Sequence, residues 1–440
     1  MPQDAAQAEP TAILSRRSLA IIFGVSIVTA VGNTGMQSVL PAIGRQIGFK
    51  DYLVAAIFSL SALLWGFSSP YWARRSDVKG RKPLMLIGLA GFLVSMVCCG
   101  LVVGAGVRHL AAPMVIFFFF LLSRALFGLF GSAANPASQA YVAERTDRDQ
   151  RTDAMAGLAG AFGLGTIIGP AVAPLFILPF LGLSGPMFAF AVIAAVMMGL
   201  VIRYLPESPG GVIALEDADA AGPTGKPKSS LRDVRLRPFL VYGFLLASCQ
   251  TAQGQSLGFL IIDKLRLPPM QAQGFTAVAM MAGAVAGLLA QWGLIRMFRI
   301  GPRDLLRWGA GLAAVANLLV AFAPSYSAVV IGYALSSLGY GFCRPGFTAG
   351  ASLAVGLSEQ ARVAGAIAAV NGVSVIAAPV FVWLYGVWGP APFLLNAVVL
   401  AGLLVFALYN GVLRAAGEAP TTEDEAALAS LERSQEGVSV

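Results

Sequence analysis

The stretch SSPYWARRSDVKGRKPLML, residues 68–86, places five basic residues and one acid within nine positions, from Arg74 to Lys82. Long apolar stretches flank it on both sides. A helix needs about 20 mostly apolar residues to cross the roughly 30 Å hydrocarbon layer of a bilayer. The charged run therefore predicts a short loop at the membrane surface, between two membrane-spanning helices.

The composition supports a membrane protein with many spans. Of 440 residues, 57% are hydrophobic and only 12% are charged, and the mean hydropathy is +0.75. A soluble protein of this length needs a more polar surface. We therefore expect an all-α integral membrane protein with twelve transmembrane helices. The apolar windows are 18–41, 52–72, 83–104, 112–141, 154–178, 184–204, 238–260, 271–296, 304–323, 328–353, 363–387 and 391–412.

Lysine and arginine predict the orientation. With a cytoplasmic N-terminus, 23 of the 30 Lys and Arg residues lie in cytoplasmic loops and tails, and five lie on the other side. Cytoplasmic loops are enriched in Lys and Arg. We therefore expect both termini in the cytoplasm. This distribution also explains the net charge of +8 without nucleic acid as a partner.

Two related halves are indicated by matching prolines. Pro136 and Pro345 are 209 residues apart, and so are Pro170 and Pro379. Transporters are often built from such repeats around a central site. We therefore expect two pseudo-symmetric six-helix bundles. The expected segments are a cytoplasmic N-tail (1–17), the first bundle (18–205), a cytoplasmic linker rich in Gly, Pro and charges (206–237), the second bundle (238–412) and a cytoplasmic C-tail (413–440).

The sequence shows no pattern typical of a metal site or of an enzyme active site. The four cysteines lie in apolar segments without metal-ligand spacing, and His109 is the only histidine. The sequence has no nucleophile–base pair and no phosphate-binding loop. We therefore expect no metal, no organic cofactor and no enzymatic activity.

The string ARRSDVKGRKP resembles the signature loop between helices 2 and 3 of the major facilitator superfamily, and its surroundings resemble the drug/proton antiporter branch. Ala73 replaces the usual first glycine, and Val78 stands where a basic residue is usual. In that family this loop closes a cytoplasmic gate by charge pairing, and Glu144 matches the acid expected to face the arginine. The resemblance thus implies a latch formed by Asp77, Gly80, Arg81, Lys82 and Glu144.

Two further motifs extend the resemblance. SRALFG in the fourth span contains Arg124, to which the family assigns a coupling role near the proton route. GLGTIIGPAVAP in the fifth span is similar to the motif shared by exporters of the superfamily. Gly165 and Gly169, four residues apart on one helix face, allow close helix packing, and Pro170 bends the helix. This motif favours export over uptake.

Polar residues within the spans are candidates for substrate binding. Amides suit hydrogen bonding in a mostly apolar pocket, although they also serve as bonds between helices. A structural role is likewise open for the two intramembrane arginines, Arg124 and Arg344. The substrate-binding candidates are Asn33, Gln37, Gln250, Gln253, Gln255, Arg344 and Asn371.

No carboxylate lies well inside any span, because Asp51 and Asp263 fall near the outer face. The residue that carries the proton is therefore open, and the cavity should be neutral to positive, which favours neutral or anionic substrates.

The resemblance implies a multi-pass protein of the cell inner membrane that exports small amphipathic, drug-like compounds by alternating access, with protons as the coupling ion. The expected partners are a small-molecule substrate and the lipid bilayer, and we expect a monomer. A narrow-specificity metabolite or siderophore exporter is the alternative within this fold. A membrane sensor that does not transport is a third possibility, against which the complete latch and exporter motif argue.

Overall fold

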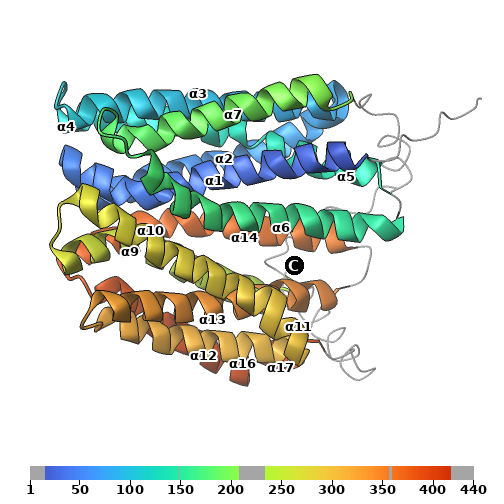
Figure 1. Ribbon diagram of the computed structural model, residues 1–440. Helices are drawn as coiled ribbons and strands as arrows, with labels where there is room; N and C mark the ends of the chain where they lie inside the picture. The colour runs from blue at the N-terminus through green and yellow to red at the C-terminus, as the bar shows by residue number, and fades with distance from the viewer. Residues whose placement is uncertain (1–14, 147, 208–232, 356–358, 418–440) are drawn as a thin grey trace, which may run out of the picture.

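A computed structural model describes residues 15–146, 148–207, 233–355 and 359–417. These residues form helices, turns and short connections, and no strand occurs among them. The long helices run roughly parallel, with α1 to α7 on one side of the molecule and α9 to α17 on the other (Figure 1). We call these groups the N-half and the C-half. The side of the molecule at which α1 begins is called the termini end, at the right of Figure 1, and the other side the opposite end.

The N-half contains six spans. Its fourth span is made of three consecutive segments that continue as one rod from Pro113 to Glu144. The elements are α1 (Arg16–Ile47), α2 (Asp51–Lys79), α3 (Arg81–Val107), α4 (Pro113–Leu126), the π-helical η1 (Phe127–Gly131), α5 (Ala134–Glu144), α6 (Arg148–Val172), the 3-10 segments η2 (Ala173–Phe176) and η3 (Gly182–Ser184), and α7 (Gly185–Tyr204).

The C-half also contains six long helical rods. A π-helical segment again interrupts one of them, the rod from Pro269 to Phe298. The elements are α9 (Arg237–Leu265), α10 (Pro269–Leu288), the π-helical η5 (Leu289–Leu294), α11 (Ile295–Phe298), α12 (Pro302–Ala321), α13 (Tyr326–Leu353), α14 (Gln360–Ser374), the 3-10 segment η7 (Val375–Ala377), α15 (Ala378–Val387), α16 (Ala391–Tyr409) and α17 (Gly411–Arg414).

The predicted fold class is confirmed. Eleven helices in the described part of the chain are long and apolar enough to cross a membrane. The twelfth, α9, has 29 residues but is more polar, since glutamines occupy its middle. The first two helices end at Ile47 and Lys79, later than the windows 18–41 and 52–72 predicted. Apolar windows detect only the part of a helix that lies in hydrocarbon, so they miss turns that continue into the interface.

The buried apolar residues are distributed differently at the two ends. Near the opposite end, one core contains residues of both halves, including Phe49 of the N-half and Phe259 and Tyr385 of the C-half. Near the termini end, each half has a core of its own. Among the described residues, the halves therefore share a core at the opposite end and have distinct cores at the termini end. The N-half core there includes Leu84, Tyr141 and Leu205, and the C-half core includes Leu236, Phe239 and Leu413.

Candidate functional site

A one-residue turn joins α2 to α3 at the termini end. Because α2 ends at Lys79 and α3 begins at Arg81, Gly80 alone links them, with a φ of 90°. A residue with a Cβ rarely adopts this conformation, so glycine is favoured here. The Gly80 N–H donates to the carbonyl oxygen of Ser76 at 3.1 Å. The turn sets the first residue of α3 beside the end of α2.

Arg81 uses this position to join several helices of the N-half. Its Nε donates to Oε1 of Glu144, at the end of α5, at 2.8 Å, and its Nη1 donates to Oγ of Ser76 at 2.9 Å. The neighbouring Lys82 donates from Nζ to the carbonyl oxygen of Ile202 in α7 at 3.1 Å. Asp77 lies near the end of α2, and its side chain is outside the described part of the structure. The residues assigned to the latch thus gather at one place, and their described contacts stay within the N-half.

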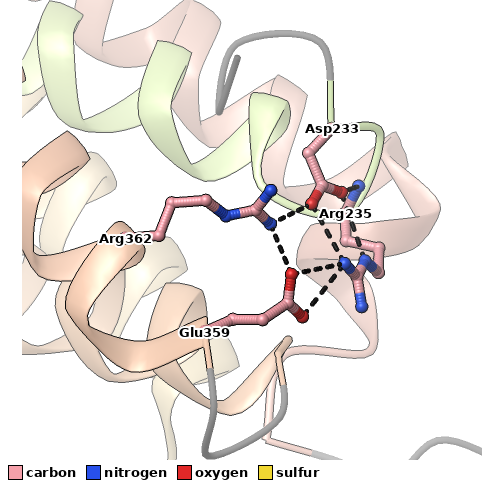
Figure 2. Close-up of polar contacts among 4 residues, drawn as sticks. All are labelled: Asp233, Arg235, Glu359 and Arg362. Carbon is pink, nitrogen blue, oxygen red and sulfur yellow. Dashed lines mark hydrogen bonds and ion pairs between the residues drawn. The ribbon is translucent and has the colours of Figure 1, made fainter. Parts of the chain in front are cut away.

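A second ionic network, which the sequence did not suggest, lies at the termini end of the C-half (Figure 2). The Nη2 of Arg362 donates to Oδ2 of Asp233 at 2.6 Å and to Oε1 of Glu359 at 2.8 Å. Arg235 bonds the same two carboxylates, with Nη2 at 3.0 Å from Oδ2 of Asp233 and 3.2 Å from Oε2 of Glu359. This C-half network ties the segment before α9 to the start of α14.

The charge pairing also governs the ionisation of Asp233, which lies outside the membrane-spanning helices. Burial of this carboxylate acts to raise its pKa, but the hydrogen bonds from Arg235 and Arg362 outweigh burial and hold the pKa of Asp233 below its ordinary value. Asp233 is therefore ionised at neutral pH.

A cavity of about 510 Å³ lies between the two halves. Its walls come from α1 and α6 of the N-half and from α9, α10, η5 and α13 of the C-half. The lining residues lie around the middle of most of these helices, for example Gln250 to Gly254 of α9 and Tyr333 to Arg344 of α13. Small and apolar residues form much of the surface, with hydroxyls and amides among them. The polar lining residues are Thr34, Gln37, Thr166, Gln250, Thr251, Gln291, Tyr333, Ser337, Tyr340 and Arg344.

The structure separates the predicted amides into two groups. Gln37 and Gln250 line the cavity, whereas Asn33, Gln253, Gln255 and Asn371 are not among its lining residues. Asn33, one turn before Gln37 on α1, instead accepts a hydrogen bond at its Oδ1 from Nη2 of Arg124 at 2.9 Å.

Of the other three amides outside the lining, two are buried and one is half-buried. Gln253 is buried and donates from Nε2 to Oγ of Ser336 in α13 at 2.6 Å. Gln255 is also buried, and Asn371 is half-buried in α14. For Asn33 and Gln253 the geometry is that of a bond between helices, the alternative considered above.

Arg344 is the charged residue of the cavity lining in the described part of the chain. Its side chain is exposed, and no ion pair joins it to another described residue. No Asp or Glu occurs among the residues that line the cavity. The cavity therefore presents a positive charge and several hydrogen-bonding groups to whatever enters it.

Arg124, the other intramembrane arginine, is enclosed within the N-half. Its side chain is almost fully buried, and its guanidinium lies 4.8 Å from the ring centres of both Phe58 and Phe127. Nη2 donates to Oδ1 of Asn33 at 2.9 Å, while Nε and Nη1 have no hydrogen-bond partner among the described residues. Arg124 does not line the cavity but is linked to it through α1.

The glycines of the fifth span lie where α6 packs closely against α1. A Cβ added to Gly165 would lie 2.6 Å from the Cβ of Ala30, and one added to Gly169 would lie 2.5 Å from the carbonyl oxygen of Val31. Both distances are far below van der Waals contact, so only glycine lets α6 pack this closely along α1. Pro170, the next residue, lies in the cavity wall. The motif thus packs one face of α6 against α1 and places the neighbouring Pro170 in the wall of the cavity.

Several lining residues were not predicted from the sequence, although one pattern could have indicated them. Tyr333, Ser337 and Tyr340 are three such residues. Together with Arg344, which was predicted, they are spaced four, three and four residues apart, which places all four on one face of α13. Gln291 lies in the π-helical η5, a kind of segment that is common at functional sites. The polar side chains of a membrane helix must therefore be grouped by the helix face they share, and not by residue type alone.

Curated relatives of this chain include bacterial resistance proteins. It is 27% identical over 349 residues to "Multidrug resistance protein 1" of Bacillus subtilis (strain 168), covering 77% of this chain and 79% of that protein. It is 24% identical over 392 residues to "Tetracycline resistance protein, class C" of Escherichia coli, covering 84% of this chain and 89% of that protein.

Solved structures share the fold. The human organic anion transporter MFSD10 superposes with a TM-score of 0.60 at 20% identity, covering 89% of this chain and 99% of that one. A peptide transporter POT in complex with sulfate superposes with a TM-score of 0.69 at 13% identity, covering 92% of this chain and 96% of that one. The model of the "Major Facilitator Superfamily" matches residues 22–374, which include the latch, the exporter motif and most of the cavity-lining helices. This multi-pass membrane protein therefore belongs to the major facilitator superfamily.

Proposed function

We propose that the protein is a secondary exporter of small amphipathic compounds, which works by alternating access in exchange for protons. The observation that carries this proposal is the cavity of about 510 Å³ between the halves, since both halves contribute to its wall. A site in this position can change its access when the halves tilt relative to each other. The protein is a transporter by family, and its relatives named for multidrug and tetracycline resistance favour export.

The proposal places the protein in the inner membrane, with both termini in the cytoplasm. The excess of Lys and Arg at the termini end supports this orientation. In that orientation the described conformation faces inward, because the halves share a core only at the opposite end. A monomer suffices for function, since one chain supplies both walls of the cavity.

The substrates that suit the cavity are neutral or anionic. A permanent cation would enter an apolar cavity without a carboxylate to pair with, and desolvating such an unpaired charge is expensive. Arg344 offers an anionic group a partner that is already inside the cavity. This feature also keeps a narrow-specificity metabolite or siderophore exporter as the second candidate, because such substrates often bear carboxylates or other anionic groups.

A drug-susceptibility and metabolite-efflux panel tests the proposal in cells with and without the protein. Gln37→Leu combined with Gln250→Leu should abolish any protection, because it removes two amides from the cavity wall. Asn371→Leu is the matched control, since this amide lies outside the lining. Protection against several unrelated compounds supports the broad exporter, and efflux of one metabolite supports the narrow one. A panel in which no compound responds to the wild-type protein would contradict export and favour the sensor.

A further inference from the structure

A chain of buried hydrogen bonds runs from the cavity wall into the C-half. Tyr340 of α13 lines the cavity, and its hydroxyl oxygen lies 3.3 Å from Nδ2 of Asn317 in α12. Oδ1 of Asn317 lies 3.4 Å from Nδ2 of Asn396 in α16, and that Nδ2 is also 3.0 Å from the carbonyl oxygen of Cys249 in α9. Four helices of the C-half thus meet in one chain of polar groups, which we call the amide chain (Tyr340, Asn317, Asn396 and the Cys249 carbonyl).

Both asparagines of the amide chain are fully buried, with 0% of their surface exposed. A buried amide is costly unless its hydrogen bonds are made, and a leucine would fill such a position in a membrane helix without that cost. Packing of the C-half therefore does not require these two side chains. A function is instead indicated at the end of the chain that reaches the cavity, which is Tyr340.

Two backbone carbonyls fix the direction of the bonds in the amide chain. Nδ2 of Asn317 donates to the carbonyl oxygen of Ala313 at 2.8 Å, and Nδ2 of Asn396 donates to that of Cys249. Because a carbonyl oxygen only accepts, neither amide can be turned around to place its own oxygen there. Asn317 must therefore donate to the hydroxyl oxygen of Tyr340 and cannot accept from it.

The hydroxyl hydrogen of Tyr340 is consequently left to bond a molecule in the cavity. No described residue accepts a hydrogen bond from this hydroxyl. Arg344 lies four residues later on the same face of α13 and also lines the cavity, and its guanidinium carries only donors. This part of the wall thus offers donors, one of them charged, and suits a group that accepts hydrogen bonds without donating any.

We propose that Tyr340 and Arg344 together bind the carboxylate of an amphipathic substrate, and that Asn317 is the positioning residue that holds Tyr340 as a donor. An ionised carboxylate only accepts hydrogen bonds, and bonds to a charged group are stronger than those between neutral groups. The apolar body of the substrate lies against Phe162 of α6 and Leu288 of α10, which line the same cavity. The substrate class is therefore an amphipathic carboxylic acid in its ionised form.

This inference rests on the proposed function in taking the cavity as the substrate site, but its test measures binding without transport. Carboxylate-selective binding by a protein that exports nothing would leave this inference standing and refute the exporter. Export confined to compounds without a carboxylate would refute this inference and leave the exporter standing.

The experiment measures equilibrium binding of tritiated decanoate to the purified full chain in nanodiscs by scintillation proximity, with empty nanodiscs as the background. Methyl decanoate and decylammonium have apolar chains of similar length, and they compete as a neutral acceptor and as a cation that only donates. We expect saturable binding of decanoate, with an affinity above that of methyl decanoate and far above that of decylammonium. Absence of saturable decanoate binding by the wild type would overturn the proposed substrate class.

Tyr340→Phe removes the hydroxyl and keeps the ring, so it should weaken decanoate binding about tenfold, as expected for a hydrogen bond to a charged group. Asn317→Leu leaves the Tyr340 hydroxyl able to turn and accept, so decanoate should bind more weakly and decylammonium more tightly. The ratio of the two affinities should then fall about fivefold, the effect of one ordinary hydrogen bond. A purely structural role for Asn317 would weaken both ligands and leave the ratio unchanged.

Tyr242→Phe is the matched control, since it removes a buried tyrosine hydroxyl of the C-half that lies outside the cavity lining and donates to the carbonyl oxygen of Leu306 at 2.7 Å. This variant should bind decanoate as the wild type does. Size-exclusion chromatography of each variant checks folding, and Tyr340→Phe decides the outcome if Asn317→Leu does not fold. Wild-type decanoate affinity in Tyr340→Phe, or an unchanged affinity ratio in Asn317→Leu, would overturn the proposal.

Discussion

The guanidinium of Arg81 bonds the carboxylate of Glu144 where α3 begins and α5 ends, and both residues belong to the N-half. The C-half network of Asp233, Arg235, Glu359 and Arg362 is likewise confined to its own half. Between the described residues, ionic contacts at the termini end therefore stiffen each half separately. Across the halves, the ionic contact is at the opposite end. Each half is thus prepared to move as a rigid body.

Reversing the charges of Arg81 and Glu144 tests this pair. Arg81→Glu or Glu144→Arg alone should reduce transport about tenfold, because each places like charges together in a poorly exposed position. The double reversal should recover part of the activity, since it restores an ion pair of opposite polarity. The measurement is initial transport rate per inserted protein, with insertion quantified by membrane fractionation. A double variant as inactive as the worse single one would show that the two residues do not act as a pair.

Gly169→Leu should disable transport, because the leucine side chain would push α6 away from α1 at Val31 and Gly35. Gly165→Leu should have the same effect through Ala30. Gly199→Leu in α7 is the matched control, since nothing lies within 4 Å of a Cβ added there. The measurement is efflux from loaded cells that express equal amounts of each variant. Normal efflux by Gly169→Leu would mean that the close contact between α6 and α1 is dispensable.

Arg344→Gln should weaken transport of an anionic substrate about tenfold, the effect of losing roughly 1.4 kcal/mol of attraction, and should affect its neutral analogue little. Uptake into inverted vesicles under an imposed pH gradient measures this selectivity with substrates that differ only in charge. Strong transport of a permanent cation by the wild type, with little transport of the neutral or anionic analogue, would refute a neutral-to-positive cavity.

Arg124→Ala should impair every substrate alike, since Arg124 is buried away from the cavity lining. The variant leaves Asn33 without its partner, and the loss of a hydrogen bond to a charged group is about 1.5–3 kcal/mol, or at least about tenfold in rate. The same vesicle assay distinguishes this uniform loss from the selective loss in Arg344→Gln. A loss limited to anionic substrates would place Arg124 at the substrate and not within the N-half.

The stability of the C-half should depend on the charge of Asp233. Because its pKa is lowered from 3.8, the ionised form contributes stability above that pH, and the contribution disappears as the pH falls through the lowered pKa. Asp233→Asn should therefore lower Tm by about 3 °C at pH 7. The difference from wild type should shrink in acid. Thermal scans of the purified protein at several pH values measure it, and a difference that stays constant down to pH 3 would contradict a role for the ionised carboxylate.

The fold could be predicted from the sequence because each membrane span is a long helix whose apolar residues are contiguous in sequence. A run of apolar residues predicts each helix without any knowledge of its neighbours. The turn at Gly80 could also be predicted from adjacent residues alone, since a glycine between a charged helix end and the next span indicates a tight turn. The helix ends were predicted less well, because Ile47 and Lys79 lie beyond the apolar windows.

The candidate site was harder to predict, because the contacts of a side chain depend on which neighbouring helices pack beside it. Asn33 and Gln37 are one turn apart, yet one bonds Arg124 and the other lines the cavity. The ion pair between Arg45 of α1 and Asp263 of α9 could not be found from spacing either, since these residues are 218 positions apart in sequence. The distance between such residues is set by the packing of the halves, which no local pattern contains.

Because the shared core joins the halves at the opposite end, a tilt of one half about this core moves its termini end the most. α1, with 32 residues, is about 48 Å long at about 1.5 Å per residue, so a tilt of about 10° at the joined end sweeps its other end through about 8 Å. A change of side-chain packing around Phe259 and Tyr385 is therefore magnified along the whole length of the helices. Conversely, a small molecule bound in the cavity contacts both halves near the middle of the helices, away from the joined end, so its attraction for both walls can draw the termini ends together.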